Sequence, residues 1–328
     1  MTAVGYALSS EEHAAVDLVA CAREAEQVGF SFAMISDHFH PWIDRQGQSP
    51  FVWSVLGAIS QVTDRLVLGT GVTCPTIRIH PAVIAQAAAT TASLLPSRFF
   101  LGVGTGERLN EHVVGAPWPD WATRSSMLEE AVNVIRQLWT GHLTTHHGDH
   151  FDVENARIYS LPSELPPLHV AASGPRMATV AARIGDGLIG TGPERELVDA
   201  YVGAGGGGPR YGQITVCWAE TAAEARRTAR EWWPTAALHG NVTQELALPK
   251  DFEDLARSVD EHDIAGAIPC GPDPDPILDT IATYVDAGYD HVYLHQVGPD
   301  QAGFLRFARA SILPRFEHAS ASAAAGSR

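Results

Sequence analysis

The sequence has few cysteines, few basic residues and no long apolar run. Its four cysteines, Cys21, Cys74, Cys217 and Cys270, are scattered singly, without the spacing of a metal site or a disulfide-rich framework. Lys and Arg number 22 against 38 Asp and Glu, and this net charge of -16 disfavours nucleic acids and anionic membranes as partners. No segment has the ~20 apolar residues of a membrane-spanning helix, and the N-terminus lacks a signal-peptide pattern. We therefore expect a cytoplasmic protein with reduced thiols.

Short apolar segments alternate with segments of helical periodicity along the 328 residues. The strand candidates are residues 4–8, 32–35, 66–69, 99–103, 168–172, 187–189, 214–218 and 291–295. The helix candidates are residues 11–28, 51–63, 81–95, 124–139, 176–183, 194–202, 221–233 and 274–287. This alternation, without a polar linker, predicts a single (β/α)8 TIM barrel over residues 1–317. The Ala- and Ser-rich residues 318–328 are predicted to be a frayed tail.

Two long segments interrupt the alternation. Residues 141–167 are predicted to form an inserted hairpin, and residues 234–269 a long excursion before the last strand. Insertions at the C-terminal face of a barrel usually shape the substrate pocket. We assign the Trp232–Trp233 pair to the packing of a helix against the barrel. The histidines of the hairpin lack the spacing of a metal site, and we predict no metal there; they are His142, His146, His147 and His150.

The segment 36–42, SDHFHPW, directly follows the apolar run 32–35. In a parallel barrel the C-terminal end of a strand lies on the active-site rim, and a histidine there titrates near neutral pH. His38 is therefore a catalytic candidate. The residues alone leave a second interpretation open, in which Asp37 and His38 only satisfy backbone groups of a turn.

The segment 101–110, LGVGTGERLN, ends a strand in small residues. Its glycine spacing is not that of a dinucleotide fingerprint, because no long helix follows at once. Small residues instead let a planar ligand approach the backbone closely. Glu107 and Asn110 then lie on the same rim as His38. In a narrow pocket Glu107 would be a proton donor or acceptor with a raised pKa.

Two further strand candidates end in small residues. They are followed by the segments 69–75, GTGVTCP, and 171–175, AASGP. The second opens a helix whose backbone amides, together with Arg176, suit a phosphate group. Small-residue strand ends on one rim favour a large planar cofactor that carries phosphate.

These segments, together with residues 80–86 (HPAVIAQ), resemble the luciferase-like, deazaflavin-dependent oxidoreductases. Within these, the chain is most similar to the glucose-6-phosphate dehydrogenases that use coenzyme F420. The resemblance extends over nearly the whole chain. It implies a luciferase-like barrel with insertions at its C-terminal face and coenzyme F420 lying across that face. Relatives form dimers, so a homodimer is also implied.

The resemblance assigns a role to each matching residue. His38 matches the catalytic base that takes the hydroxyl proton of the alcohol, Glu107 the proton partner of the reduced deazaflavin, and Trp42 the aromatic residue that shields the histidine. A non-prolyl cis peptide is implied at Gly71–Val72. The implied cofactor contacts are Asp37, Gly71, Val72, Cys74, Thr105, Gly106, Asn110, Ser173, Gly174, Arg176 and Met177.

The substrate is where this chain departs from those dehydrogenases. The basic residues that bind the sugar phosphate in relatives align with Glu194, Glu245 and Ala267. Of the phosphate pocket, only Thr191 is retained as a substrate contact. Acidic residues in place of lysines would repel a phosphate. We therefore predict hydride exchange between F420 and an alcohol/carbonyl pair that has no phosphate.

Three alternatives remain open at this point. The chain is a sugar-6-phosphate dehydrogenase if Arg195, Lys250 or Arg210 replaces the missing clamp. A flavin-dependent luciferase-like monooxygenase would bind FMN and consume oxygen. A non-catalytic cofactor-binding protein would have no turnover to lose on mutation of His38.

Overall fold

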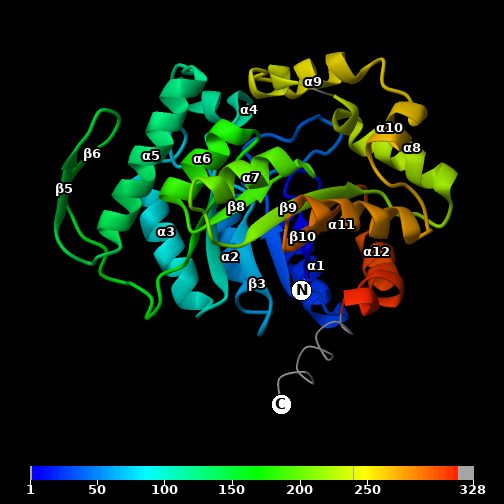
Figure 1. The fold of residues 1–328 in the computed structure, drawn as a ribbon, viewed down its shortest axis with the longest axis horizontal. Coiled ribbons are helices and arrows are strands. Elements are labelled where there is room, and N and C mark those ends of the chain that lie inside the picture. Colours follow the sequence, from blue (N-terminus) through cyan, green and yellow to red (C-terminus); the bar gives the residue numbers. More distant parts are fainter. Residues whose placement is uncertain (1, 239, 317–328) are drawn as a thin grey trace.

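The computed structural model describes residues 2–238 and 240–316 and shows a closed barrel of eight parallel strands with helices around it (Figure 1). The strand order around the barrel is β1-β10-β9-β8-β7-β4-β3-β2. All eight predicted strands are present, which confirms the barrel. The strands are β1 (Ala3–Leu8), β2 (Phe32–Ile35), β3 (Val67–Thr70), β4 (Phe99–Val103), β7 (Leu168–Ala171), β8 (Gly187–Gly190), β9 (Arg210–Val216) and β10 (His291–Gln296).

The eight predicted helices are present, with ends that differ by up to four residues from prediction, whereas α4 (Arg108–Glu111) and α12 (Gln301–Phe307) were not predicted. The α-helices are α1 (Ala15–Val28), α2 (Val52–Ile59), α3 (Pro81–Leu94), α4 (Arg108–Glu111), α5 (Trp121–Leu138), α6 (Pro175–Ile184), α7 (Arg195–Gly203), α8 (Ala222–Trp232), α11 (Asp275–Ala287) and α12 (Gln301–Phe307). Short helices η1 (His112–Val114) and η4 (Ala308–Ile312) follow α4 and α12. Among the described residues, no helix is long and apolar enough to cross a membrane.

One difference from prediction that matters for the site is the start of α1. Helical periodicity suggested a start at Glu11, but the helix begins at Ala15. Glu11 and Glu12 are only 3% and 6% exposed. Their carboxylates instead contact histidines at the top of the barrel, which a position in the first helical turn would not allow.

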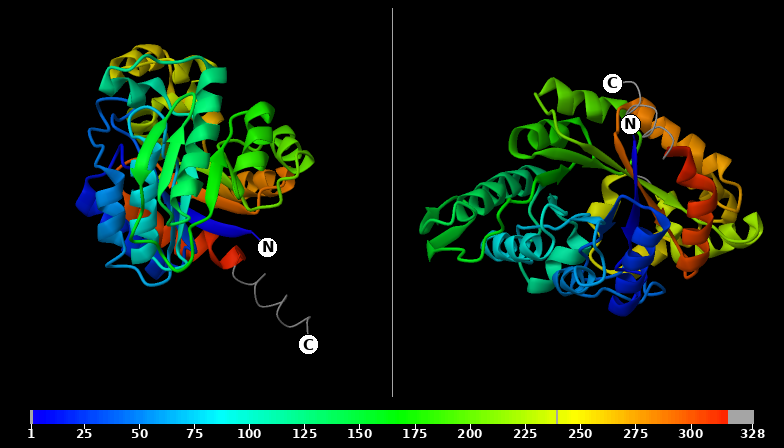
Figure 2. Two further views of the ribbon diagram at one scale, coloured as in Figure 1. Left: turned by 90° about the vertical axis from the view of Figure 1, so that its left-hand side faces the viewer. Right: turned by 90° about the horizontal axis from the view of Figure 1, so that it is seen from below.

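Two insertions lie outside the barrel. The predicted hairpin is confirmed as β5 (Thr144–His147) and β6 (Asp152–Ala156), at one edge of the molecule (Figures 1 and 2). Described residues between 234 and 267 lie above the C-terminal ends of the strands, and we call them the roof. The roof contains η2 (Pro234–Ala237), η3 (Asn241–Gln244), α9 (Pro249–Ala256) and α10 (Glu261–Ala267). The predicted tail, 318–328, lies outside the described residues.

Local sequence explains where the helices that pack on the barrel begin and end. In α1 the small or apolar side chains of Leu18, Ala22 and Ala25 are buried at helical spacing, and Gly29 ends the helix with a φ of 112°. At the start of α3, Pro81 occupies the first turn, and the ring of His80 accepts a hydrogen bond from a backbone N–H of that turn. These signals place each helix against its neighbouring strands.

Aromatic rings fill the lower interior of the barrel. The ring centroids of Phe100 and Tyr211 lie 4.9 Å apart, and those of Tyr211 and His291 lie 4.5 Å apart. Burial lowers the pKa of the nearby His169 to about 4, so its ring is neutral at pH 7. Because rings occupy the interior, space for a ligand is left only above them, at the C-terminal ends of the strands.

These rings fit because neighbouring strand positions lack side chains. A Cβ atom at Gly69 would lie 2.0 Å from the ring of Phe100, well inside van der Waals contact. Gly57 in α2 has no neighbouring heavy atom within 4 Å of the same position and serves as a matched control.

We predict that Gly69→Ala lowers the free energy of unfolding by about 1–3 kcal/mol, because the new methyl group displaces Phe100 in a filled interior. Gly57→Ala should raise it by about 0.5–1 kcal/mol, since alanine is the better helix former. Urea unfolding followed by circular dichroism measures both values. Equal effects of the two substitutions would contradict this account of the barrel interior.

Candidate functional site

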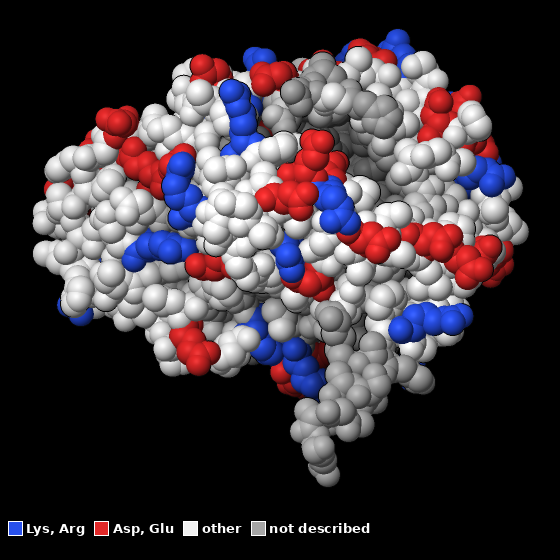
Figure 3. Space-filling view, in the orientation of Figure 1, with Lys and Arg blue, Asp and Glu red and all other residues white. Residues whose placement is uncertain are grey.

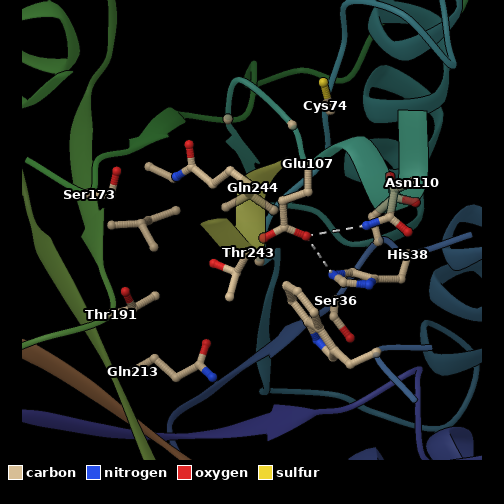
Figure 4. A pocket seen from close by; sticks show the side chains of 18 of the residues that line it. Ser36, His38, Cys74, Glu107, Asn110, Ser173, Thr191, Gln213, Thr243 and Gln244 are labelled. Carbon is tan, nitrogen blue, oxygen red and sulfur yellow. Dashed lines mark hydrogen bonds and ion pairs between the residues drawn. The ribbon is translucent and has the colours of Figure 1, made fainter. Parts of the chain in front are cut away.

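A pocket of about 570 Å³ lies between the upper ends of the barrel strands and the roof (Figure 4). It is lined by residues from segments far apart in the sequence, which the closed barrel brings together. Most of the residues predicted for the site line this pocket: Asp37, His38, Trp42, Gly71, Val72, Cys74, Thr105, Gly106, Glu107, Asn110, Ser173, Met177 and Thr191.

Two predicted cofactor residues, Gly174 and Arg176, do not line the pocket. Gly174 is the N-cap of α6, and Arg176 is exposed in the first turn of that helix. The Arg176 guanidinium lies 5.6 Å from the ring centre of Trp121, whose side chain does line the pocket. Both residues therefore lie at the edge of the pocket, beside the start of α6.

His38 lies between two carboxylates. Its Nε2 atom is 3.4 Å from Glu11 Oε1 and 3.6 Å from Glu107 Oε2. Its Nδ1 atom is 3.2 Å from the backbone carbonyl oxygen of His40, which only accepts hydrogen bonds. In the neutral ring Nδ1 therefore carries the proton, and Nε2, which lies near the two carboxylates, can take up a second proton. This nitrogen is a proton acceptor whose protonated form would be stabilised on two sides.

The two carboxylates differ in their pKa values. Burial alone would raise the pKa of Glu11, but nearby His38 and a hydrogen bond from Ser36 hold it below its usual value. Burial raises the pKa of Glu107, and the charge of Glu11 adds to the rise although His38 opposes it. Two neighbouring carboxyl groups with pKa values shifted apart are suited to different roles, one as a fixed negative charge and one as a proton carrier.

Asn110 and Trp42 fix the position of His38. Asn110 Oδ1 accepts hydrogen bonds from the backbone N–H groups of Phe39, at 2.9 Å, and His40, at 3.2 Å. Its Nδ2 lies 3.4 Å from Glu107 Oε2, so one side chain joins the segment after β2 to Glu107 (Figure 4). The ring of Trp42 packs against His38, with centroids 5.0 Å apart. Hydrogen bonds of Asn110 therefore link the segment that carries His38 to Glu107, and Trp42 packs on the histidine ring.

Asp37 belongs to a buried ion-pair network at the wall of the pocket. Its carboxylate accepts hydrogen bonds from Thr73 Oγ1, at 2.7 Å, and from Arg78 Nη2, at 2.8 Å. Arg78 also lies near Glu111, with Nε 3.6 Å from Oε1. The side chain of Arg78 is 7% exposed and faces two carboxylates, so its charge is neutralised within the protein.

One wall of the pocket is flat because side chains are absent from it. The peptide bond between Gly71 and Val72 is cis, as predicted. A Cβ atom at Gly104 would lie 2.8 Å from Val72 Cγ2, and one at Gly106, where φ is 82°, would lie 2.6 Å from Cys74 Sγ. A planar ring can approach the backbone along this wall, and a non-glycine residue would obstruct it.

None of the described residues that line the pocket is Lys or Arg. Arg210 lies at the start of β9, at the opposite end of the barrel, and is bound there by Asp290 with Nη2 and Oδ2 2.6 Å apart. It is therefore excluded as a replacement phosphate clamp. Arg195 and Lys250 are exposed and are not among the lining residues. The space-filling view shows a hollow with acidic side chains beside it (Figure 3).

Among the lining residues that sequence reasoning missed are Glu11, Gln213, Trp233 and His295. The assignment of Trp233 to helix packing alone is wrong, because its ring lies over His295 with centroids 4.4 Å apart and both side chains reach the pocket. Glu11 follows β1 as His38 follows β2, so the rule that strand ends bear functional groups could have found it. The periodicity of a helix concealed it.

Comparisons with known proteins identify similar chains. The sequence model of the luciferase-like monooxygenases matches residues 1–291. The F420-dependent glucose-6-phosphate dehydrogenase of Intrasporangium calvum is 39% identical over 330 positions, covering 96% of this chain and 98% of that protein. Its namesake from Mycobacterium tuberculosis is 36% identical, covering 95% and 97%. An F420-dependent secondary alcohol dehydrogenase, solved with an F420-acetone adduct, superimposes with a TM-score of 0.87 at 29% identity, covering 95% of this chain and 98% of that one.

The raised pKa of Glu107 leads to a prediction about stability. Because its pKa is higher in the folded protein than in the unfolded chain, its contribution to stability is full below the unfolded pKa and is lost as the pH rises through the folded pKa. Glu107→Gln should therefore raise the melting temperature at pH 7.5 and change it less at pH 4.5.

Differential scanning fluorimetry at the two pH values measures this difference. The matched control is Glu220→Gln, an exposed residue outside the pocket, for which we expect no pH-dependent change. A Glu107→Gln effect of the same size at both pH values would show that burial does not disfavour the charged carboxylate.

Proposed function

This chain belongs to the luciferase-like monooxygenase family and is an F420-dependent oxidoreductase, and we propose that it acts on an alcohol or the corresponding carbonyl compound without a phosphate group. The predicted cofactor, coenzyme F420, is confirmed by the relatives that carry its name. The observation that carries the substrate proposal is the position of His38 between Glu11 and Glu107, in a pocket whose described lining has no Lys or Arg.

The pocket fits a deazaflavin on one side. The pocket wall at Gly71, Gly104 and Gly106 has no side chains, and an added Cβ atom would crowd neighbouring protein atoms, so a planar ring can lie against the backbone there. The start of α6 lies at the edge of the pocket, where backbone N–H groups and Arg176 would bind a phosphate of the cofactor tail. When bound, the deazaflavin supplies a ring carbon that accepts or returns a hydride.

His38 is proposed to be the base for the alcohol. Its Nε2 lone pair would accept the hydroxyl proton while the C–H bond is broken and its two electrons leave with the hydride, so that the alcohol becomes a carbonyl. Glu11 and Glu107 then lie 3.4 and 3.6 Å from the positive ring. In the reverse direction His38 returns the proton to the carbonyl oxygen. A positioned base of this kind contributes about 10²–10⁴-fold to the rate.

Glu107 is proposed to be the proton partner of the cofactor. A carboxyl group with a raised pKa holds a proton more readily than a free glutamate, and Asn110 orients its Oε2. Trp42 is proposed to shield His38 from water by packing on its ring, and it is itself fixed by Phe252 of the roof, with centroids 5.2 Å apart. Proton transfer would therefore occur in a partly closed site.

The sugar-6-phosphate dehydrogenase remains a second candidate because of the 39% identity to such an enzyme. The argument against this candidate is the negative charge where the phosphate would bind. Glu245, aligned with a basic residue of the clamp, is an exposed carboxylate that lies 3.7 Å from Arg124 Nη1. Glu194 is an exposed acid two residues past Gly192. A phosphate at these positions would meet negative charge.

We predict that F420 binds and that neutral secondary alcohols bleach its absorbance anaerobically, whereas glucose 6-phosphate does not. His38→Ala should lower kcat by at least about 10²-fold and leave the dissociation constant of F420 unchanged. Anaerobic titration with F420, and separately with FMN, followed by absorbance with each substrate, measures these quantities.

The control variant is His142→Ala, an exposed histidine of the hairpin segment, which should change neither value. Bleaching by glucose 6-phosphate would establish the second candidate instead. Binding of FMN in place of F420, with oxygen consumption, would indicate a monooxygenase. Full turnover by His38→Ala would remove this residue from the reaction.

We further propose that the enzyme is a cytoplasmic homodimer. All four cysteines are free thiols, which is typical of a reducing compartment. The side chains of Phe39 and Phe51, 50% and 54% exposed, lie in segments joined by a hydrogen bond from Ser49 Oγ to the carbonyl of His38. Light scattering should give twice the 35.1 kDa chain mass, and a monomer at micromolar concentration would contradict the proposal.

A further inference from the structure

The wall of the pocket across from His38 is made of polar side chains. Thr191 follows β8, Gln213 lies in β9, and Tyr293 and His295 lie in β10. Figure 4 shows Thr191 and Gln213 on the opposite side of the pocket from His38 and Asn110. The proposed chemistry at His38 does not use this wall. The side chains of Gln213, Tyr293 and His295 are nevertheless joined to one another by hydrogen bonds.

Glu12 fixes the protonation of the His295 ring. Its Oε2 lies 3.2 Å from His295 Nε2, and both side chains are almost fully buried, at 0% and 3% exposed. Its Oε1 accepts a hydrogen bond from the backbone N–H of Gly298, at 2.8 Å. A carboxylate only accepts, so Nε2 of His295 carries the proton. In the neutral ring, Nδ1 is then an acceptor.

This tautomer orients Gln213. His295 Nδ1 lies 3.4 Å from Gln213 Nε2, which must be the donor, and Gln213 Oε1 accepts a hydrogen bond from the Tyr293 hydroxyl at 3.2 Å. The backbone is fixed too, because the Tyr284 hydroxyl donates to the carbonyl of Gln213 at 2.6 Å. A primary amide has two N–H donors and two acceptor sites. One donor and one acceptor site of Gln213 therefore remain for a molecule in the pocket.

We propose, on the basis of the function proposed above, that Gln213 binds a second, uncharged oxygen of the substrate, away from the carbon that reacts. The substrate class is then an uncharged polyol or sugar rather than a simple alcohol. His295 and Glu12 are positioning residues, because they fix the direction of the Gln213 amide. Thr191 adds a hydroxyl on the same wall.

The charge of the surrounding groups supports an uncharged substrate. The carboxylates of Glu11 and Glu107 lie on the other side of the same pocket, and no described lining residue is Lys or Arg. An anionic substrate group would lose its hydration without gaining a cationic partner. A hydroxyl group, in contrast, both donates and accepts, and it matches the free donor and acceptor of an oriented amide.

The test compares 2-butanol with 1,3-butanediol, which share a carbon skeleton and a secondary hydroxyl and differ by one hydroxyl, with glucose as a larger polyol. For Gln213→Met, which keeps the size and removes the hydrogen bonds, we expect KM for 1,3-butanediol and glucose to rise about tenfold or more. The kinetic constants for 2-butanol should change less than twofold.

Two further variants separate binding from positioning. Gln213→Glu keeps the shape but cannot donate to His295 Nδ1 or to a substrate oxygen, and it replaces the Met variant if that one does not fold. Glu12→Gln should raise KM for the diol with little change in kcat, and ¹⁵N shifts of the His295 ring should show a changed tautomer. The matched control, Gln86→Met at an exposed position of α3, should behave as the wild-type enzyme does.

The outcomes distinguish this inference from the function on which it rests. Equal losses for 2-butanol and the diol, or unchanged KM for both, would overturn the role of Gln213 while leaving the alcohol oxidoreductase intact. An unchanged dissociation constant of F420 in every variant, with the loss confined to the polyols, supports the role. If wild-type protein binds no F420 or turns over no alcohol, the proposed function itself fails, and the inference fails with it.

Discussion

The barrel is closed by the parallel pairing of its first and last strands, β1 and β10. The paired residues include Ala3 and His291. β1 is also paired with β2 on its other side. The segment after β1 therefore lies between the segment that carries His38 and the strand that carries His295. Its two neighbouring glutamates contact one histidine each, Glu11 on one side and Glu12 on the other. Closure of the barrel thus creates both ordered histidines, and an open sheet would leave at least one of them without its carboxylate.

The pocket formed by this closure has two walls of different chemistry. Glycines at the ends of β3 and β4 present backbone to a flat ligand, whereas β9 and β10 present side chains that donate and accept hydrogen bonds. His38 and Glu107 lie where groups held by the two walls would meet. The charged residues of the lining are acidic, apart from histidine, in the part of the chain that the structure describes. These carboxyl groups can assist a proton transfer. They would repel an anionic group of the substrate, such as a phosphate, and prevent its tight binding in the same pocket.

Much of this arrangement could be predicted from the sequence, because it depends on local patterns. Apolar runs of three to five residues identified the strands, and the rule that functional groups follow parallel strands identified His38 and Glu107. Glu11 was missed because its segment has helical spacing, whereas α1 begins only at Ala15 and the Glu11 carboxylate instead contacts His38. Trp233 and Gln213 were missed for a related reason. Whether such side chains point into a pocket depends on strand register and on the path of an insertion, and neither has a signature in composition or periodicity.

The roof packs on the barrel rim through apolar contacts, among them Trp42 with Phe252, and through a hydrogen bond from the backbone N–H of Asp44 to the side-chain carboxylate of Glu253. It enters the chain after α8 and returns to it before α11, without contributing a strand to the closed sheet. Its length and sequence can therefore vary without a change in barrel register. In evolutionary terms, the proton-transfer groups lie on the barrel and the cover of the pocket lies in one insertion. New substrates can therefore be acquired by changes in the roof while the proton-transfer groups stay in place.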